Sequence, residues 1–147
     1  MPTFYHGSGD KMNPGDVLTA RGPLYESDWK DANFYAALER HRPADKLAHR
    51  DAVFMVCVVD DVDLAAGGPE YIFEVLPIGP VSKHDMNWSG EIACLISDGL
   101  DVNSDEVRQA ARSYWVGNPS PNETLWEYLA SSAKILRVEV YATFETV

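Results

Sequence analysis

The sequence predicts an α+β fold in which several short strands make small sheets and helices pack on one side of them. Three observations support this prediction. The chain has 147 residues, of which 46% are hydrophobic and 11% aromatic, so one domain over residues 1–147 has enough apolar side chains for a core. Short apolar runs bounded by Gly and Pro recur along it, as strands do. Between them lie stretches with apolar residues at helical spacing.

The N-terminal segment predicts two short strands joined by a turn. Residues 4–6 (FYH) form the first strand, which ends in Gly-Ser-Gly. Residues 12–16 (MNPGD) place Pro and Gly at adjacent turn positions, and residues 17–18 begin the second strand. Residues 19–30 are polar and predict irregular structure, in which Tyr25 and Trp29 suit a lid over a ligand.

The middle of the chain alternates helix and strand. Asp31 is a plausible N-cap for a helix over residues 31–40, which ends before Pro43. Residues 52–59 (AVFMVCVV) are apolar on both faces and predict a central strand. A short helical turn follows over residues 62–66, and residues 71–76 (YIFEVL) predict another strand.

The C-terminal part predicts an extended or looped segment over residues 81–88, then two helices and a last strand. Ser104 precedes a helix over residues 105–115 whose first turn is acidic, which favours the helix dipole. Leu125, Trp126 and Leu129 favour a second short helix over residues 123–130. Alternating residues predict a strand over residues 134–147.

The charge and hydropathy of the chain limit the classes of partner that it is expected to bind. A net charge of −11 repels phosphates, so non-specific binding to nucleic acid is not expected. No apolar run approaches the roughly 20 residues that cross a bilayer, and the N-terminus has no leader, so a cytoplasmic protein without a membrane partner is expected. Residues 40–50 carry four positive charges and one negative charge, either as a solvated loop or as a phosphate-binding rim.

The string FYHGS, residues 4–8, is the most informative local pattern. A histidine at a strand end followed by Gly-Ser-Gly leaves its ring open to a ligand, because Gly7 and Gly9 allow another molecule to approach closely. The alternative is a half-buried histidine satisfied by a backbone carbonyl. The four histidines fall in no zinc motif, and the chain has no phosphate-binding loop, so no metal is predicted.

Two blocks, residues 4–8 (FYHGS) and 12–18 (MNPGDVL), resemble the opening of the rifampin ADP-ribosyltransferases and related small ADP-ribosyltransferase-like proteins, with Ser8 where threonine is usual. Residues 42–54 resemble a segment of an uncharacterised bacterial and phage branch of that superfamily. Residues 114–117 and 126–129 resemble the ending of that branch. The resemblance implies an ADP-ribosyltransferase-like fold, with small mixed or antiparallel sheets around an NAD cleft and flanking helices.

The same resemblance implies a His-Tyr-acid triad. His6 matches the histidine that holds ribose hydroxyls of NAD, and Phe54 occupies the place of the tyrosine that stacks on nicotinamide, without the hydroxyl. Asp85 is the closest match for the acid, with Glu91 and Glu74 as substitutes. The full set expected to contact NAD is Tyr5, His6, Gly7, Ser8, Phe54, Arg50 and Arg42, with Arg21 as a further cation for the pyrophosphate.

The resemblance therefore implies an NAD-dependent mono-ADP-ribosyltransferase that uses NAD as co-substrate and no metal. Breaking the nicotinamide–ribose bond develops positive charge on the ribose, which a fixed carboxylate stabilises. The acceptor is open: a protein, a nucleic acid or a small molecule. Two alternatives stay open beside transfer: an NAD glycohydrolase-type toxin, and a catalytically degenerate nucleotide- or protein-binding module such as a phage-encoded inhibitor, which Phe54 at the tyrosine position favours.

Overall fold

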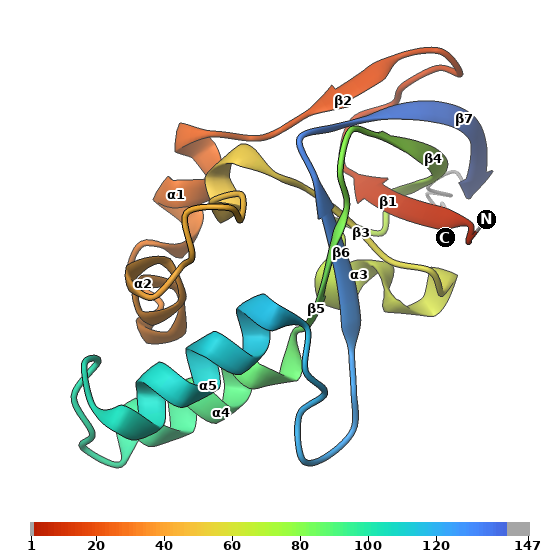
Figure 1. The fold of residues 1–147 in the computed structure, drawn as a ribbon. Coiled ribbons are helices and arrows are strands. Elements are labelled where there is room, and N and C mark those ends of the chain that lie inside the picture. Colours follow the sequence, from red (N-terminus) through yellow and green to blue (C-terminus); the bar gives the residue numbers. More distant parts are fainter. Residues whose placement is uncertain (1, 141–147) are drawn as a thin grey trace, which may run out of the picture.

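Two antiparallel sheets form the centre of the fold (Figure 1). The structure is a computed structural model and describes residues 2–140. The four-stranded sheet has the order β1 (Phe4–Ser8), β4 (Tyr71–Ile78), β7 (Ser132–Val140), β2 (Val17–Thr19), and the three-stranded sheet has the order β3 (Val53–Met55), β6 (Trp126–Ala130), β5 (Ser82–Asp85). Each of these strands pairs antiparallel with its neighbours. The predicted α+β class is confirmed at this level.

The helices gather mainly on one side of the sheets (Figure 1). They are α1 (Pro23–Trp29), α2 (Asn33–Arg40), α3 (Val62–Ala65), α4 (Asn87–Ser97) and α5 (Asp105–Val116), with 3₁₀ turns η1 (His49–Asp51) and η2 (Val59–Asp61). Helix α3 lies apart from the others, against β1 and β3. Within residues 2–140, no helix combines the length and apolarity needed to cross a bilayer.

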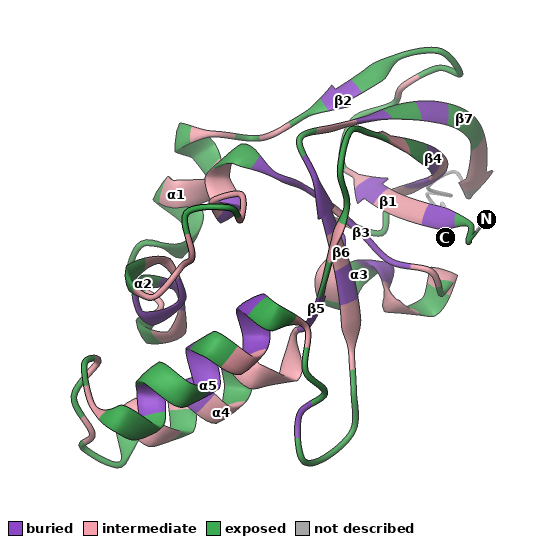
Figure 2. Cartoon of the chain, viewed as in Figure 1, coloured by how far each residue is buried: buried purple, intermediate pink, exposed green. Residues whose placement is uncertain are grey.

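Two main apolar clusters stabilise this arrangement, and a smaller one joins α3 to the four-stranded sheet. The first fills the space between the sheets and includes Phe4, Met55 and Phe73. The second joins α2, α4 and α5 through residues such as Leu38 and Trp115. Figure 2 shows the buried residues concentrated on the strands and on the inward side of α5. The sheets and the helices are therefore packed separately, and the candidate site lies where they meet.

The apolar run 52–59 is not one central strand, as predicted. It contributes only Val53–Met55 to the three-stranded sheet, and then Val56 pairs with Tyr5 of β1 through two backbone hydrogen bonds of 2.7 and 3.0 Å. The segment thus passes from one sheet to the other. Val53, Met55 and Val56 are all buried because the chain lies between two sheets there, which accounts for an apolar pattern on both faces.

Three further predictions are corrected, one of them in part. Residues 123–130 do not form a helix: their second half is strand β6, whose inward residues Glu127 and Leu129 alternate with Trp126 and Tyr128. Residues 19–30 are not irregular, because helix α1 begins at Pro23, a residue suited to the first turn of a helix. The prediction that residues 81–88 are extended or looped is confirmed for β5 (Ser82–Asp85) and is wrong for Asn87 and Trp88, which begin α4.

Helix α5 follows its prediction closely. The Ser104 side chain caps it by accepting from the amide of Val107, and Gly117 ends it in the left-handed conformation at φ 84°. In α2, by contrast, the N-cap is Ala32 without a side-chain hydrogen bond, not Asp31. The predicted terminal strand is present as β7 up to Val140, and its residues 141–147 lie outside the described part of the chain.

Candidate functional site

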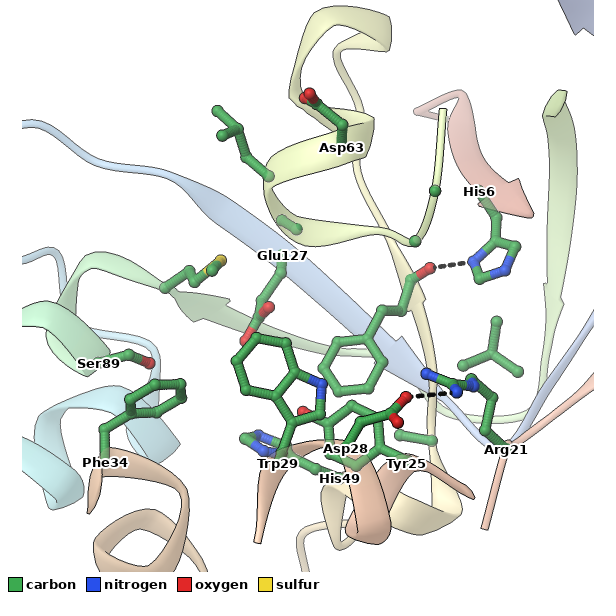
Figure 3. Close-up of a pocket in the computed structure, with 18 of the residues that line it drawn as sticks. His6, Arg21, Tyr25, Asp28, Trp29, Phe34, His49, Asp63, Ser89 and Glu127 are labelled. Atoms are coloured by element: carbon green, nitrogen blue, oxygen red, sulfur yellow. Dashed lines mark hydrogen bonds and ion pairs between the residues drawn. The ribbon is translucent and has the colours of Figure 1, made fainter. Parts of the chain in front are cut away.

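A pocket of about 450 Å³ opens where the two sheets meet helices α1 and α3. Its volume lies within the usual range for small-molecule sites. His6 of β1, Phe54 of β3 and Glu127 of β6 contribute to its lining, together with Tyr25 and Trp29 of α1. Figure 3 shows His6 and Glu127 on different sides of this space, with Tyr25 and Trp29 of α1 below them in the view. Residues distant in the sequence are thus brought to one cavity.

His6 is placed with one ring nitrogen fixed and the other available. Its Nδ1 lies 2.6 Å from the carbonyl oxygen of Phe54, so Nδ1–H donates and Nε2 carries the lone pair. Burial lowers the pKa of His6, which keeps the ring neutral at pH 7. A neutral Nε2 facing a pocket can accept a hydrogen bond from a ligand hydroxyl.

Phe54 lines the pocket, but another ring of the same chain covers it. Tyr25 stacks on Phe54 with ring centroids 5.3 Å apart and an angle of 14° between the planes. Trp29, one turn further along α1, also lines the pocket. The two aromatic residues expected to suit a lid therefore both line the pocket, and Tyr25 is stacked on Phe54.

Glu127 is the buried carboxylate of the pocket, which Asp28 and Asp63 also line from exposed positions, and the sequence analysis missed it. It is 4% exposed, its Oε1 accepts a hydrogen bond from the Tyr114 hydroxyl, and the residue lines the pocket. Burial, with a contribution from the charge of Asp85, raises the pKa of Glu127 to about 7. The signal that could have revealed it is the alternation in WEYLA, in which a glutamate occupies an inward position of a strand.

Asp85, the acid implied by the resemblance, lies outside the pocket lining and is used in contacts within the fold. It is fully buried, does not line the pocket, and accepts backbone N–H groups of Asn87 (3.0 Å), Ser120 (2.7 Å) and Leu125 (2.9 Å). Burial opposes ionisation of this carboxyl, but the amide donors outweigh it and lower its pKa. These contacts attach the segment after α5 to the end of β5.

The two substitute acids also lie away from the pocket lining. Glu74 of β4 faces Arg137, with 3.6 Å between its Oε2 and the arginine Nε. Glu91 of α4 accepts from the Asn122 side chain at 3.3 Å. Neither carboxylate is near enough to His6 and Phe54 to share their pocket lining.

The neighbours of His6 in the sequence make contacts within the fold and do not line the pocket. A Cβ on Gly7 would lie 2.0 Å from the carbonyl oxygen of Gly68, so glycine is required at position 7 for the chain's own segment to approach. Tyr5 and Ser8 do not line the pocket: Tyr5 packs against the apolar cluster beneath α3, and Ser8 Oγ accepts the amide of Asp10 at 3.0 Å. Of the predicted string, His6 alone reaches the cavity, and Gly7 places Gly67 and Gly68 on its wall.

Of the three arginines predicted to bind the pyrophosphate, the structure places only Arg21 in the pocket lining. Arg50 pairs with Glu26 of α1, and Arg42 is held by Glu39 at 3.1 Å and by the Lys46 carbonyl at 2.6 Å. Neither arginine lines the pocket. Arg21 does, and it forms an ion pair of 2.6 Å with Asp28 (Figure 3). The basic stretch 40–50 therefore contributes the neutral His49 to the pocket rather than a cationic rim.

Comparison of the chain with protein-family profiles, curated proteins and solved structures gave no match. Within residues 2–140, no three His, Cys, Asp or Glu side chains are grouped so that they could hold a metal ion. The chemistry of the pocket is argued from its own groups: a neutral imidazole acceptor, stacked aromatic rings, one arginine, a buried carboxylate with a pKa of about 7, and the exposed carboxylates of Asp28 and Asp63.

Proposed function

We propose that the pocket binds NAD and that the protein is a mono-ADP-ribosyltransferase with an ADP-ribosyltransferase-like fold. The observation that carries this proposal is the meeting of His6, Phe54 and Glu127 in one pocket from three different strands. The resemblance of FYHGS to the rifampin ADP-ribosyltransferases supplies the expected triad. Glu127 replaces Asp85 as its acid, because Glu127 alone among these candidate carboxylates lines the cavity.

Each group has a role in the proposed reaction. His6 Nε2 accepts a ribose hydroxyl, and the rings of Phe54 and Tyr25 provide faces for nicotinamide. Arg21 exchanges Asp28 for the pyrophosphate. The nicotinamide–ribose bond breaks with its electron pair passing to the ring nitrogen, while Glu127 stabilises the positive charge that develops on the ribose. The acceptor nucleophile then bonds to the same ribose carbon, and its proton passes to Glu127 or to water.

The test is nicotinamide release from labelled NAD by the purified protein, alone and with cell lysate as a source of acceptors. Transfer predicts release coupled to labelling of an acceptor, and Glu127→Gln should lower the rate by about 100-fold or more. Glu91→Gln is the matched control, since that carboxylate lies outside the pocket, and should keep the parent rate. An equally active Glu127→Gln protein would remove Glu127 from the mechanism.

A second candidate is a binding module without turnover, and one observation favours it: Tyr25 occupies the face of Phe54 that a nicotinamide ring would use. This candidate predicts no nicotinamide release but a higher unfolding temperature in the presence of NAD or ADP-ribose. Release without any acceptor would indicate NAD hydrolysis instead.

A further inference from the structure

We propose that Tyr114 and His49 are positioning residues for Glu127: they anchor one of its carboxylate oxygens inside the protein, so that the other is presented to the pocket. The inference deepens the proposed function and depends on it for its catalytic meaning. The three residues come from different elements, η1, α5 and β6, which are joined here by side-chain hydrogen bonds.

The hydrogen bonds have a defined direction. The Tyr114 hydroxyl donates to Oε1 of Glu127, so its only hydrogen is used. His49 Nε2 lies 2.7 Å from the Tyr114 oxygen, which can take part only as an acceptor. When Glu127 is ionised, His49 therefore carries its proton on Nε2, and its buried Nδ1, 3.8 Å from Glu39 Oε1, has no hydrogen-bond partner within residues 2–140. The order of donation is His49 to Tyr114 to Glu127.

All three members of this chain of hydrogen bonds are buried, and its two end members, His49 and Glu127, line the pocket. Tyr114 is fully buried, and His49 and Glu127 are each 4% exposed. In residues 2–140, no partner is found for Glu127 Oε2, and that atom is not among the buried polar atoms that lack one. Since Glu127 lines the pocket, the free oxygen is the one that a ligand meets.

His49 suits this role because it stays neutral. Burial, together with His84 and Arg42 nearby, lowers its pKa to about 3. Its backbone amide donates to Glu39 Oε1 at 2.9 Å, and its ring packs against Tyr35 and Trp115. A neutral ring in a fixed position keeps donating one hydrogen bond throughout the physiological pH range.

The charged and titratable groups around Glu127 act in opposite senses. Asp85 of β5 disfavours its ionisation, as burial does, whereas the Tyr114 hydroxyl favours the ionised form. The neighbouring groups on other elements are the neutral His84, which pairs with Glu127 across the β5–β6 ladder, Tyr25 of α1, and Glu39 of α2. Tyr114 is thus the group that keeps Glu127 from being fully protonated at neutral pH.

The experiment compares Tyr114→Phe with the parent by carbon-13 NMR titration of the Glu127 side-chain carboxyl. We expect the pKa of Glu127 to rise by about one pH unit or more, because a hydrogen bond to the charged form is lost. The pH profile of nicotinamide release should move upward by the same amount. Tyr35→Phe is the control: it removes a hydroxyl from the same aromatic cluster, and the Glu127 titration should not move. An unchanged Glu127 pKa in Tyr114→Phe would overturn the proposal.

A second measurement needs no variant that could misfold. Nitrogen-15 shifts of His49 in the parent protein should show the Nε2–H tautomer at pH 7, and an Nδ1–H tautomer would contradict the order of donation.

His49→Gln, which retains a donor, should then preserve the Glu127 pKa better than His49→Leu. Both NMR results are independent of turnover. If no nicotinamide is released by any protein, the proposed function fails while the positioning of Glu127 is still decided.

Discussion

Asp85 and Glu127 are two buried carboxylates on neighbouring strands, and they differ in their hydrogen-bond donors and in the direction of their pKa shifts. Asp85 ends β5 opposite Trp126, and Glu127 is the next residue of β6. Asp85 is surrounded by three backbone donors and has a lowered pKa, whereas Glu127 has one hydroxyl donor and a pKa raised to about 7. Burial alone therefore does not identify a functional acid. Within residues 2–140, the two carboxylates differ in the number of donors that they accept from, three backbone amides for Asp85 and one hydroxyl for Glu127.

The largest expected effect is the loss of stability in Asp85→Ala. Three buried or half-buried amide groups would lose their acceptor, which we expect to lower the free energy of unfolding by about 3–5 kcal/mol in urea denaturation. Asp101→Ala is the control, because Asp101 is exposed and accepts one local amide, that of Asn103, at 2.7 Å. Its cost should stay below about 1 kcal/mol.

The dependence of the free energy of unfolding on pH in acid gives an independent check on Asp85. Its folded-state pKa lies below the usual 3.8, so the stability it contributes is present above that pH and is lost as the pH falls through the folded pKa. The difference in stability between the parent and Asp85→Asn should therefore shrink in acid. A difference that is the same at pH 7 and at the lowest pH of the folded state would show that the charge of Asp85 is unimportant.

Glu127→Gln should show the opposite pH dependence. The pKa of Glu127 rises from 4.5 to about 7 on folding, so the folded protein binds more protons than the unfolded chain between these values, and stability falls as pH rises through them. Removing the charge should stabilise the protein by on the order of 2–3 kcal/mol at pH 8–9, and by much less at pH 5. Thermal unfolding at both pH values measures this, and a gain at pH 5 alone would contradict the assigned pKa.

Tyr25→Ala tests what raises the pKa of Glu127. The tyrosine ring covers part of the pocket, and its loss should admit water and lower the Glu127 pKa by about one pH unit. Carbon-13 titration of the Glu127 carboxyl is the measurement. If the pKa does not move, the charge of Asp85 rather than exclusion of water is responsible, although burial is the larger cause in the structure.

The smallest effect is expected for Glu26, a carboxylate that is paired but exposed. Its side chain is 46% exposed and pairs with Arg50, which is 41% exposed. Glu26→Gln should change the free energy of unfolding by less than about 1 kcal/mol, and the change should diminish in high salt. A larger, salt-independent loss would mean that this pair fixes α1 over the pocket.

The sequence predicted the elements whose signals are local. Helix α5 has a capping serine, an acidic first turn and a left-handed glycine at its end, all within its own residues. Strands β1 and β4 were predicted from short apolar runs. For strand β6 the sequence predicts a helix because of the positions of Leu125, Trp126 and Leu129. The partner of its inward Glu127 is Tyr114, which lies 13 residues away in the sequence and gives no local signal.

Only part of the candidate site could be predicted, because some of its residues have local sequence signals and others depend on partners distant in the sequence. The string at the end of the first strand indicates His6, the resemblance implies both His6 and Phe54, and both residues line the pocket. The acid could not be predicted, because proximity to a turn does not show where a carboxylate points: Asp85 turns to the amides of Ser120 and Leu125, which are 35 and 40 residues away. Likewise the arginines of residues 40–50 are used in ion pairs and backbone contacts that only the folded chain provides.

The stacking of Tyr25 on Phe54 makes helix α1 an internal competitor for the pocket. Two rings with centroids 5.3 Å apart leave no room for a third, which needs roughly 7 Å between the outer planes. A planar ligand that stacks on the face of Phe54 covered by Tyr25 must therefore displace the tyrosine. Its apparent dissociation constant exceeds the intrinsic one by the reciprocal of the fraction of molecules in which α1 has moved away. Occupancy of the site is thus governed by the position of one helix as well as by the contacts of the ligand.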